Sequence, residues 1–380
     1  MQYSEKTSIL SVCIPVYNGG DHLVTSVKSI LGCPFSEVEV VVNDNHSGDD
    51  SINQLKMISD NRLKVFVNEK NEGPFRNCFL ALSRGTGKYL MLLQDNDELV
   101  IENLGKYIDF LYNTNAIAIK NGIFSLRNKQ GFVCGAEFLY YSNILNHFSM
   151  SVYLRDVFQC MSFKRDCFDI KKTAYCQENW DIQIVANTDT LKKKEYYLNA
   201  DIKIIQVPER VVESRTRSMV KKMPFASYSY ESYVYYFNEK LNFIHEEFDI
   251  ESEFIICVLY IFYATVTMVT YRYYENMHDK NSAKRYGIPF INYSKKEWIQ
   301  MGGKFYKEIL PSIEKIKKLS TNEKIIMKLM VSCNSALFEA EHFTKQRNFF
   351  NLRYIYLCLK IRFLRIKIEK RLEIYCVNST

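Results

Sequence analysis

The chain has 380 residues, of which 47% are hydrophobic and 24% charged, and its formal net charge is +7. This composition excludes a disordered chain, and the length exceeds what one hydrophobic core usually serves, so we expect two domains. Eleven cysteines are scattered without a Cys-x-x-Cys pair, and the first residues lack a basic region followed by an apolar one, which predicts reduced thiols, no secretory signal and a cytoplasmic protein.

The first predicted elements are a buried strand and an amphipathic helix. Residues 8–14 form a β-branched, apolar run that Pro15 ends, and such a run is typical of a buried strand. We expect Asp21 to cap the following helix, which Gly32 and Pro34 end. Its apolar residues fall on one face and are Leu23, Val27, Ile30 and Leu31.

Three more strands follow, separated by helices. The last of them is an apolar run bounded by Gly85 and Gly87, which indicates a strand buried on both faces. Four strands in this alternation predict an α/β fold with a doubly wound, parallel sheet and right-handed crossovers. The expected strands are 38–42, 62–67 and 89–93, the helices 51–59, 75–83 and 102–112, and later strands 116–119, 123–127 and 132–140.

Polar clusters rich in Asn and Asp follow three of the four strands. They are Tyr17-Asn18, residues 43–50 and Asp95-Asn96-Asp97, and they meet in space because parallel strands share one carboxyl edge. Two carboxylates one residue apart repel each other and suit a hard divalent cation that shares its other positions with a diphosphate and water. The alternative is a solvated acidic turn. In both cases we expect an exposed carboxylate at Asp97.

Four motifs in order now resemble a known family. They are Ile14-Pro15-Val16-Tyr17-Asn18, Asn43-Asp44-Asn45 with Ser47 and Asp49, Asn71-Glu72-Gly73, and Asp95-Asn96-Asp97. Together they look like a family 2 glycosyltransferase of the GT-A fold. The match is dense over the first hundred residues and looser to about residue 220.

The resemblance implies a GT-A domain over residues 1–220, with a mostly parallel sheet flanked by helices, and a helical C-terminal domain over 221–380. It also implies an inverting enzyme of cell-surface polysaccharide synthesis that moves a sugar from a nucleotide diphosphate, a UDP-sugar, to a glycan or lipid-linked acceptor. The implied cofactor is Mn²⁺ or Mg²⁺, and no nucleic acid partner is expected. A nucleotidyltransferase is disfavoured because no Gly-rich phosphate loop follows the first strand.

The resemblance also assigns residues to the donor site. Pro15, Tyr17 and Asn18 would border the nucleoside, and Asp44 with Asn45 would bind the base unless they only form a turn. Asp95 would lie by the ribose and the metal, while Asp97 would hold the metal against the diphosphate. The remaining donor-side candidates are basic: Arg76, which is otherwise a surface cation, and Arg215 and Arg217, which would grip the diphosphate unless they belong to a basic linker.

The catalytic base is the point where this sequence departs from the family. Asn179 stands where relatives usually carry an Asp, and an amide cannot take a proton from an acceptor hydroxyl. Glu178 is the favoured base and Asp181 the alternative; Glu178 could instead cap a helix. A further interpretation of Asn179 is a non-catalytic relative that binds nucleotide sugar or acts as a scaffold.

The second half contains two stretches that concern membranes. Residues 254–271 carry no charge, which fits a buried helix of the C-terminal domain or a short membrane span. Residues 349–372 interleave Lys and Arg with large apolar residues, which suggests peripheral contact with an anionic membrane at the inner face of the cell membrane. The alternative is a packed terminal helix with a solvated basic face.

Overall fold

The computed structural model describes residues 8–121, 130–135, 137–138, 161–167, 196–199, 204–206, 280–281, 284, 290, 320–345 and 350–377. The chain divides into two compact units, residues 1–148 with 155–210 and residues 149–154 with 211–380. The domain boundary expected after residue 220 stays a prediction.

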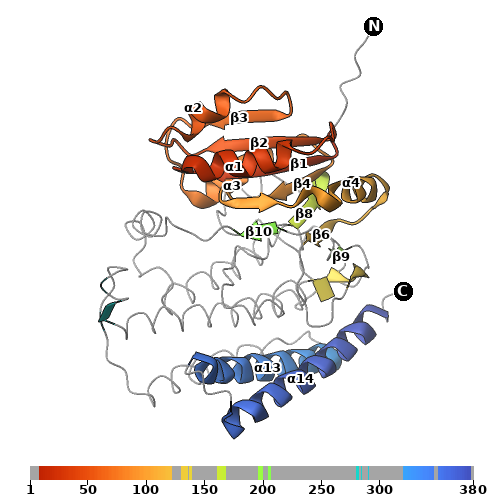
Figure 1. Cartoon of the computed structure of the whole chain (residues 1–380). Coiled ribbons are helices and arrows are strands. Elements are labelled where there is room, and N and C mark those ends of the chain that lie inside the picture. Colours follow the sequence, from red (N-terminus) through yellow and green to blue (C-terminus); the bar gives the residue numbers. More distant parts are fainter. Residues whose placement is uncertain are drawn as a thin grey trace. The chain divides into compact units, whose positions relative to one another are not determined.

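Among the described residues, the first unit contains an eight-stranded sheet with the order β3-β2-β1-β4-β8-β6-β9-β7 (Figure 1). The strands β3, β2, β1 and β4 are parallel to one another. β8 runs antiparallel to both β4 and β6, β9 is parallel to β6, and β7 is antiparallel to β9. The sequence-based expectation of a mostly parallel α/β sheet is confirmed. The strands are β1 (Leu10–Val16), β2 (Val38–Asp44), β3 (Leu63–Val67), β4 (Tyr89–Leu92), β6 (Ala118–Asn121), β7 (Gly131–Val133), β8 (Met161–Lys164) and β9 (Tyr196–Asn199).

The helices between these strands follow the expected alternation, and each lies within three residues of its predicted bounds. From β1 the chain passes through β2 to β3 at one edge and then returns to the other side of β1 with β4. Right-handed crossovers therefore place the returning helix α3 on the face opposite α1. The helices are α1 (Gly20–Leu31), α2 (Ser51–Lys56), α3 (Pro74–Ser83), the short 3₁₀ helix η1 (Ile101–Asn103) and α4 (Leu104–Asn113).

The core forms because β1, β2 and β4 are largely apolar, with the polar residues Glu39, Asn43 and Asp44 placed near the ends of β2. All four residues of β4 and all seven of β2 are buried, as expected for strands covered on both faces. The apolar side of α1 packs onto them through Leu23, Val27 and Ile30, which are fully buried. Figure 1 shows α1 in front of these strands.

Two local expectations are wrong. Asp21 does not cap α1, because the helix already begins at Gly20; Asp21 lies in its first turn and accepts a hydrogen bond from Gln54 Nε2 at 3.3 Å. Nor do residues 132–140 form one strand, since β7 ends at Val133 and residues 135, 137 and 138 are helical. Glu137 Oε2 accepts a hydrogen bond from Cys134 N at 3.2 Å, a capping interaction that favours the helix.

The cysteines also differ from expectation at one position. Cys134 is disulfide-bonded, so the prediction of thiols that are all reduced is wrong there. An irregular spacing of cysteines does not reveal which of them the fold brings close. Five of the described cysteines are free, namely Cys13, Cys33, Cys78, Cys333 and Cys358. The strand expected at residues 123–127 lies outside the described residues.

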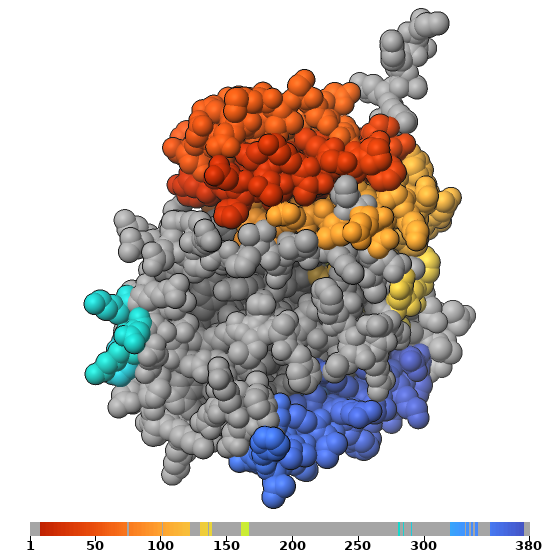
Figure 2. All heavy atoms as spheres, in the orientation of Figure 1, coloured from red at the N-terminus to blue at the C-terminus, as the bar shows by residue number. Residues whose placement is uncertain are grey.

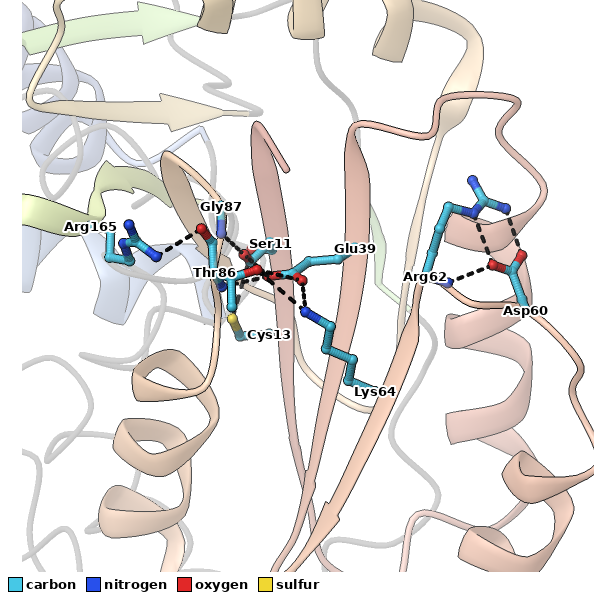
Figure 3. Close-up of polar contacts among 9 residues, drawn as sticks. All are labelled: Ser11, Cys13, Glu39, Asp60, Arg62, Lys64, Thr86, Gly87 and Arg165. Atoms are coloured by element: carbon cyan, nitrogen blue, oxygen red, sulfur yellow. Dashed lines mark hydrogen bonds and ion pairs between the residues drawn. The ribbon is translucent and has the colours of Figure 1, made fainter. Parts of the chain in front are cut away.

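A buried carboxylate joins the amino ends of the parallel strands (Figure 3). Glu39 on β2 is 3% exposed and accepts hydrogen bonds from Ser11 Oγ, Lys64 Nζ and Thr86 N, each at 2.5 Å. Burial raises the pKa of Glu39, but the hydrogen bonds from Lys64, Ser11 and Thr86 outweigh it and hold that pKa below its usual value. The charged carboxylate thus ties β1, β2, β3 and the segment before β4 together.

Arg62, just before β3, holds the carboxyl end of α1, and Figure 3 shows this arginine with Asp60. Arg62 donates to Asp60 Oδ1 at 3.0 Å and Oδ2 at 2.8 Å, and a hydrogen bond from Arg62 lowers the pKa of Asp60. Its guanidinium also donates to Leu31 O at 2.6 Å and Cys33 O at 2.7 Å. Leu31 O is the last carbonyl of α1 and Cys33 O follows the helix, so the arginine caps the end of α1.

The glycines before β4 allow that strand to approach β1. Gly87 N donates to Ser11 Oγ at 2.7 Å, and a Cβ on Gly87 would lie 2.8 Å from Ser11 N. A Cβ on Gly85 would lie 2.9 Å from Ser11 Cβ. Since the backbone nitrogen of Ser11 cannot yield at such a distance, only glycine fits at position 87, and the amino ends of β1 and β4 are held close together.

The second unit contributes two long helices, α13 (Thr321–Lys345) and α14 (Leu352–Val377), which pack along each other. No helix within the described ranges is long and apolar enough to cross a membrane. The uncharged stretch 254–271 lies outside them. The buried residues of the pair are Ile326, Met327, Met330, Cys333, Ala336 and Ala340 of α13 with Leu357, Ile361, Leu364, Ile368, Leu372 and Tyr375 of α14.

We expect Gly87→Ala to destabilise the protein by about 1–3 kcal/mol, the usual cost of overpacking, because the new methyl group meets the β1 backbone. The matched control is Gly48→Ala, where an added Cβ meets nothing within 4 Å and the change should stay within about 0.5 kcal/mol. Urea unfolding followed by circular dichroism measures both. Equal midpoints for the two variants would show that the close approach of Gly87 to Ser11 is not needed.

Candidate functional site

Polar residues gather where the strand order of the sheet reverses. β1 lies between β2 and β4, and the chain winds outward from β1 in one direction before it returns on the other side. In open α/β sheets, ligands bind outside the carboxyl ends of the strands at such a switch point. The candidate site therefore lies where the loops after β1, β2 and β4 meet.

Pro15 ends the pairing of β1 with β4 at this point. Cys13 O accepts a hydrogen bond from Leu93 N at 3.0 Å, and Pro15, two residues further along the same edge of β1, has no N–H to continue the ladder. The last pair in register is Cys13 with Leu92, whereas the pairing of β1 with β2 continues to Val16 and Asp44. The carboxyl ends of β1 and β4 are therefore free to part.

The loops after β1 and β2 are tied to each other by side chains. Asn18 has a φ of 55°. Its Oδ1 accepts a hydrogen bond from Gly48 N at 2.9 Å, and its own N–H donates to Ser47 Oγ at 2.8 Å. Asp49 Oδ2 accepts from Gly20 N at 2.9 Å. Tyr17, beside Asn18, is 38% exposed. These contacts place Tyr17 and Asn18 next to the loop that follows Asp44.

Asp44 forms the turn at the end of β2. Its carboxylate is 2% exposed and accepts hydrogen bonds from Ser47 N at 3.1 Å and from Ser47 Oγ. This is the side-chain to backbone turn that the sequence offered as one interpretation of Asp44 and Asn45. Its role in binding a base stays a prediction, because a carboxylate oxygen can accept more than one hydrogen bond.

A buried asparagine that the sequence analysis missed holds the ends of β1 and β2. Asn77 on α3 donates from Nδ2 to Val16 O at 3.2 Å and to Asn43 O at 3.0 Å. Its Oδ1 accepts from Asn43 Nδ2 at 2.6 Å and from Asn68 Nδ2 at 3.0 Å. All four hydrogen-bonding positions of its amide are thus used. Asn43 Oδ1 is buried without a hydrogen-bond partner.

The same set of amides continues through Asn45, which was expected to bind the donor. Asn45 Oδ1 accepts from Glu72 N at 2.8 Å and from Asn68 Nδ2 at 3.2 Å, and its Nδ2 donates to Asn71 Oδ1 at 2.9 Å. Asn45 is 2% exposed, so its side chain shapes the loop that leads into α3. We call Asn43, Asn45, Asn68, Asn71 and Asn77 the asparagine cluster.

Arg76 lies at the start of α3 beside this cluster. Its Nε is 3.2 Å from Glu72 Oε2, and its side chain is 49% exposed. The structure therefore shows the surface cation that the sequence gave as an alternative. A role in donor binding stays a prediction for Arg76.

The two carboxylates after β4 are buried. Asp95 is 4% and Asp97 2% exposed, so the expectation of an exposed carboxylate at Asp97 is wrong. The reason is that the chain folds back onto α1 and forms β5 (Asp97–Leu99), which pairs antiparallel with β10 (Ile204–Gln206). Ser26 Oγ on α1 donates to Asp95 O at 3.1 Å, which holds this segment.

Asp95 lies against the loop that follows β1, since an ideal Cβ on Gly19 would be 3.5 Å from Asp95 Oδ2. No group of three or more His, Cys, Asp or Glu side chains that could hold a metal ion occurs in the described part of the chain. Asp95 and Asp97 nevertheless fit a hard divalent cation, because such an ion accepts one or two carboxylates and completes its shell with substrate phosphate and water.

The remaining site candidates, Glu178, Asp181, Arg215 and Arg217, lie outside the described residues together with Asn179. Their roles stay predictions.

Comparison with known proteins decides the family. Residues 11–161 match the family model for glycosyl transferase family 2. The N-terminal part of the chain is a family 2 glycosyltransferase domain with the GT-A fold. At the switch point of this domain, Asp95 and Asp97 follow β4 on one side of β1, and the asparagine cluster joins the end of β2 on the other side to α3.

Three proteins illustrate the similarity of the family 2 domain. The Streptococcus pneumoniae glycosyltransferase GlyG is 32% identical over 108 residues, 28% of this chain and 35% of that protein. The Campylobacter jejuni GalNAc(5)-diNAcBac-PP-undecaprenol beta-1,3-glucosyltransferase is 35% identical over 94 residues, 24% of this chain and 30% of that protein. The chain thus matches about a third of the length of these relatives.

The third is a solved structure. The crystal structure of S. aureus TarS 1–349 in complex with UDP-GlcNAc superposes with a TM-score of 0.52 at 15% identity, over 90% of this chain and 93% of that one. At this identity the likeness concerns the fold.

We expect Asn77→Ala to destabilise the family 2 domain by at least about 2 kcal/mol, because it leaves two buried carbonyls and two amide groups without their partner. The matched control is Asn53→Ala on the surface of α2, where Asn53 Nδ2 donates only to Asp50 Oδ1 at 2.9 Å and the cost should stay below about 0.5 kcal/mol. Thermal unfolding compares the two. If both variants melt together, Asn77 does not clamp the strands.

Proposed function

We propose that the protein is an inverting, metal-dependent glycosyltransferase that moves a sugar from a UDP-sugar to a hydroxyl of a glycan or lipid-linked acceptor in cell-surface polysaccharide synthesis. The observation that carries the proposal is the pair of buried carboxylates, Asp95 and Asp97, at the switch point of a family 2 domain. The name of the Campylobacter jejuni relative supports the acceptor class, since it specifies an undecaprenol diphosphate.

The loops after β1 and β2 form the proposed donor side. Pro15, Tyr17 and Asn18 would border the nucleoside, and Asp44 would accept a hydrogen bond from the base while it keeps the turn with Ser47. Asn45 would act indirectly, because its amide is already used within the asparagine cluster. The exposed ring of Tyr17 supplies an aromatic face for a planar base.

Asp97, with Asp95, would hold Mn²⁺ or Mg²⁺ against the diphosphate. The ion, when bound, supplies Lewis-acid stabilisation of the charge that develops on the leaving group. Arg215 and Arg217 are proposed to add charge-assisted hydrogen bonds to the diphosphate. Asp95 is proposed to contact both the metal and the ribose. Its side chain lies against the loop after β1, on the proposed nucleoside side, which supports the contact with the ribose.

Glu178 is proposed to take the proton from the acceptor hydroxyl, with Asp181 as the alternative. The deprotonated oxygen would attack the sugar carbon from the face opposite the diphosphate, and a single displacement inverts that carbon. A lipid-linked acceptor would bring the protein to the inner face of the cell membrane.

Asp97→Asn should lower transfer more than a hundredfold in the presence of Mn²⁺, because the amide holds a divalent cation far less well than a carboxylate. UDP with Mn²⁺ should also stop raising the unfolding temperature, whereas a ligand at a hundred times its dissociation constant stabilises the unaltered protein by about 2.7 kcal/mol. The control is Asp109→Asn on the exposed face of α4, which should change neither quantity. Full turnover of the protein after chelation of all divalent ions would contradict the metal assignment.

Glu178→Gln should lower turnover by roughly two to four orders of magnitude, the usual contribution of a general base, with little change in donor affinity. Asp181→Asn in the same assay should have a mild effect. The reverse ranking would transfer the role to Asp181. If the unaltered protein transfers no sugar but Asn179→Asp creates activity, the proposal of a catalyst is replaced by that of a non-catalytic nucleotide-sugar-binding relative.

A further inference from the structure

α14 carries two apolar faces. One packs against α13 through its six buried apolar residues, Leu357 to Tyr375. The other is exposed to solvent, and it includes Leu352 at 85%, Leu359 at 63% and Phe363 at 56% exposure. A helix that only covered its domain would show polar residues on this side. We call the second side the outer face of α14; it consists of Leu352, Ile355, Tyr356, Leu359, Phe363, Ile366 and Ile374.

The outer face runs as a stripe along the helix. From Leu352 to Ile366 its members lie at most four residues apart, which at 3.6 residues per turn places them on one side over roughly 21 Å, and Ile374 continues that side beyond the exposed Lys370. Phe350, just before the helix, is 94% exposed and extends the apolar series. Figure 2 shows that residues of α13 and α14, in blue, reach the molecular surface. Contiguous apolar surface of this kind marks an interaction site.

Cations border the stripe. Arg353 and Arg371 are used within the helix pair, since Arg353 Nε lies 2.7 Å from Glu339 Oε1 and Arg371 donates to Asn322 Oδ1 at 3.0 Å. Arg362 and Lys367 are exposed on its two sides and Lys360 is half-buried, while the exposed Lys370 lies in line with the stripe between Ile366 and Ile374; the acidic Glu373 is also exposed beside it. Lys367 Nζ lies 4.4 Å from the centre of the Phe363 ring, so its aliphatic stem runs beside the stripe.

We propose that the outer face of α14 lies in the interface of an anionic lipid bilayer, with its apolar residues in the acyl boundary and Lys360, Arg362, Lys367 and Lys370 at the headgroups. Long basic side chains beside an apolar helix face are suited to this position. A second copy of the chain would bring like charges together across the stripe. The charge of the border therefore selects an anionic surface, and a flat bilayer accommodates a straight stripe of this length.

The proposal adds a surface to the proposed function but rests on α14 alone. Of the two interpretations of residues 349–372, the structure combines parts of both, because the helix packs on its neighbour and also exposes an apolar face. The sequence could not assign the apolar residues to one side or the other, since both sets recur at helical spacing.

The test is sedimentation of the full chain with vesicles of phosphatidylcholine, with and without phosphatidylglycerol. We expect the chain to bind only the vesicles that contain the anionic lipid. Lys367→Gln/Lys370→Gln should weaken this binding roughly 30-fold, because two cations are removed from the bilayer surface. The charge-matched control is Lys324→Gln/Lys328→Gln on the exposed side of α13, which should bind like the unaltered protein.

Leu359→Ser/Phe363→Ser should lose binding more than tenfold even at low salt, because the apolar part of the contact is removed. All variants should unfold at the temperature of the unaltered protein, since these side chains face solvent. Absence of binding to anionic vesicles, or equal binding to neutral ones, would overturn the proposal. So would a dimer in sedimentation velocity that Leu359→Ser/Phe363→Ser converts to a monomer, which would make the outer face a protein interface. Vesicle binding requires no sugar donor, so its failure is distinguishable from failure of the transferase assay.

Discussion

The missing N–H of Pro15 is the constraint on which the site depends. At their amino ends, β1 and β4 are held together by Gly87, Ser11 and the buried carboxylate of Glu39. At their carboxyl ends the ladder stops after Cys13, because proline offers no donor to the next carbonyl of β4. β1 and β4 are thus paired at their amino ends and unpaired at their carboxyl ends. The acidic segment with Asp95 and Asp97 follows the unpaired end of β4.

Amides rather than apolar contacts hold the loops around this opening. The asparagine cluster connects β2, the 68–73 loop and α3, and Asn77 reaches the last carbonyl of β1. Each amide has donors on one side and an acceptor on the other, so the partners of each amide fix its orientation, although Asn43 Oδ1 is left without one. An apolar plug of the same volume would tolerate several arrangements. The cluster therefore specifies where the loops after β1 and β2 lie, which packing alone would leave loose.

The parallel half of the sheet was predictable because its strands are largely apolar and end in Pro, Gly or polar clusters, so β1 to β4 and their helices appear close to their expected bounds. The convergence of Asn18, Asp44 and Asp95 followed from strand direction alone. Asn77 could not be recognised, since a single Asn in a helix gives no local signal of four long-range hydrogen bonds. The burial of Asp97 depends on β10, more than one hundred residues later, and a pairing so distant in sequence leaves no trace near the carboxylate. The helical conformation of residues 135, 137 and 138 was hidden because the capping residue, Glu137, lies within an apolar stretch.

The loops after β1 and β2 cross-link each other through Asn18, Ser47, Gly48, Asp49 and Gly20. Two of the residues in this region, Asn18 and His46, adopt left-handed backbone conformations that few side chains accept. The loops consequently have little conformational entropy left to lose when a ligand binds between them. A ligand at this edge meets a surface that is already ordered, so affinity is not reduced by the cost of arranging it.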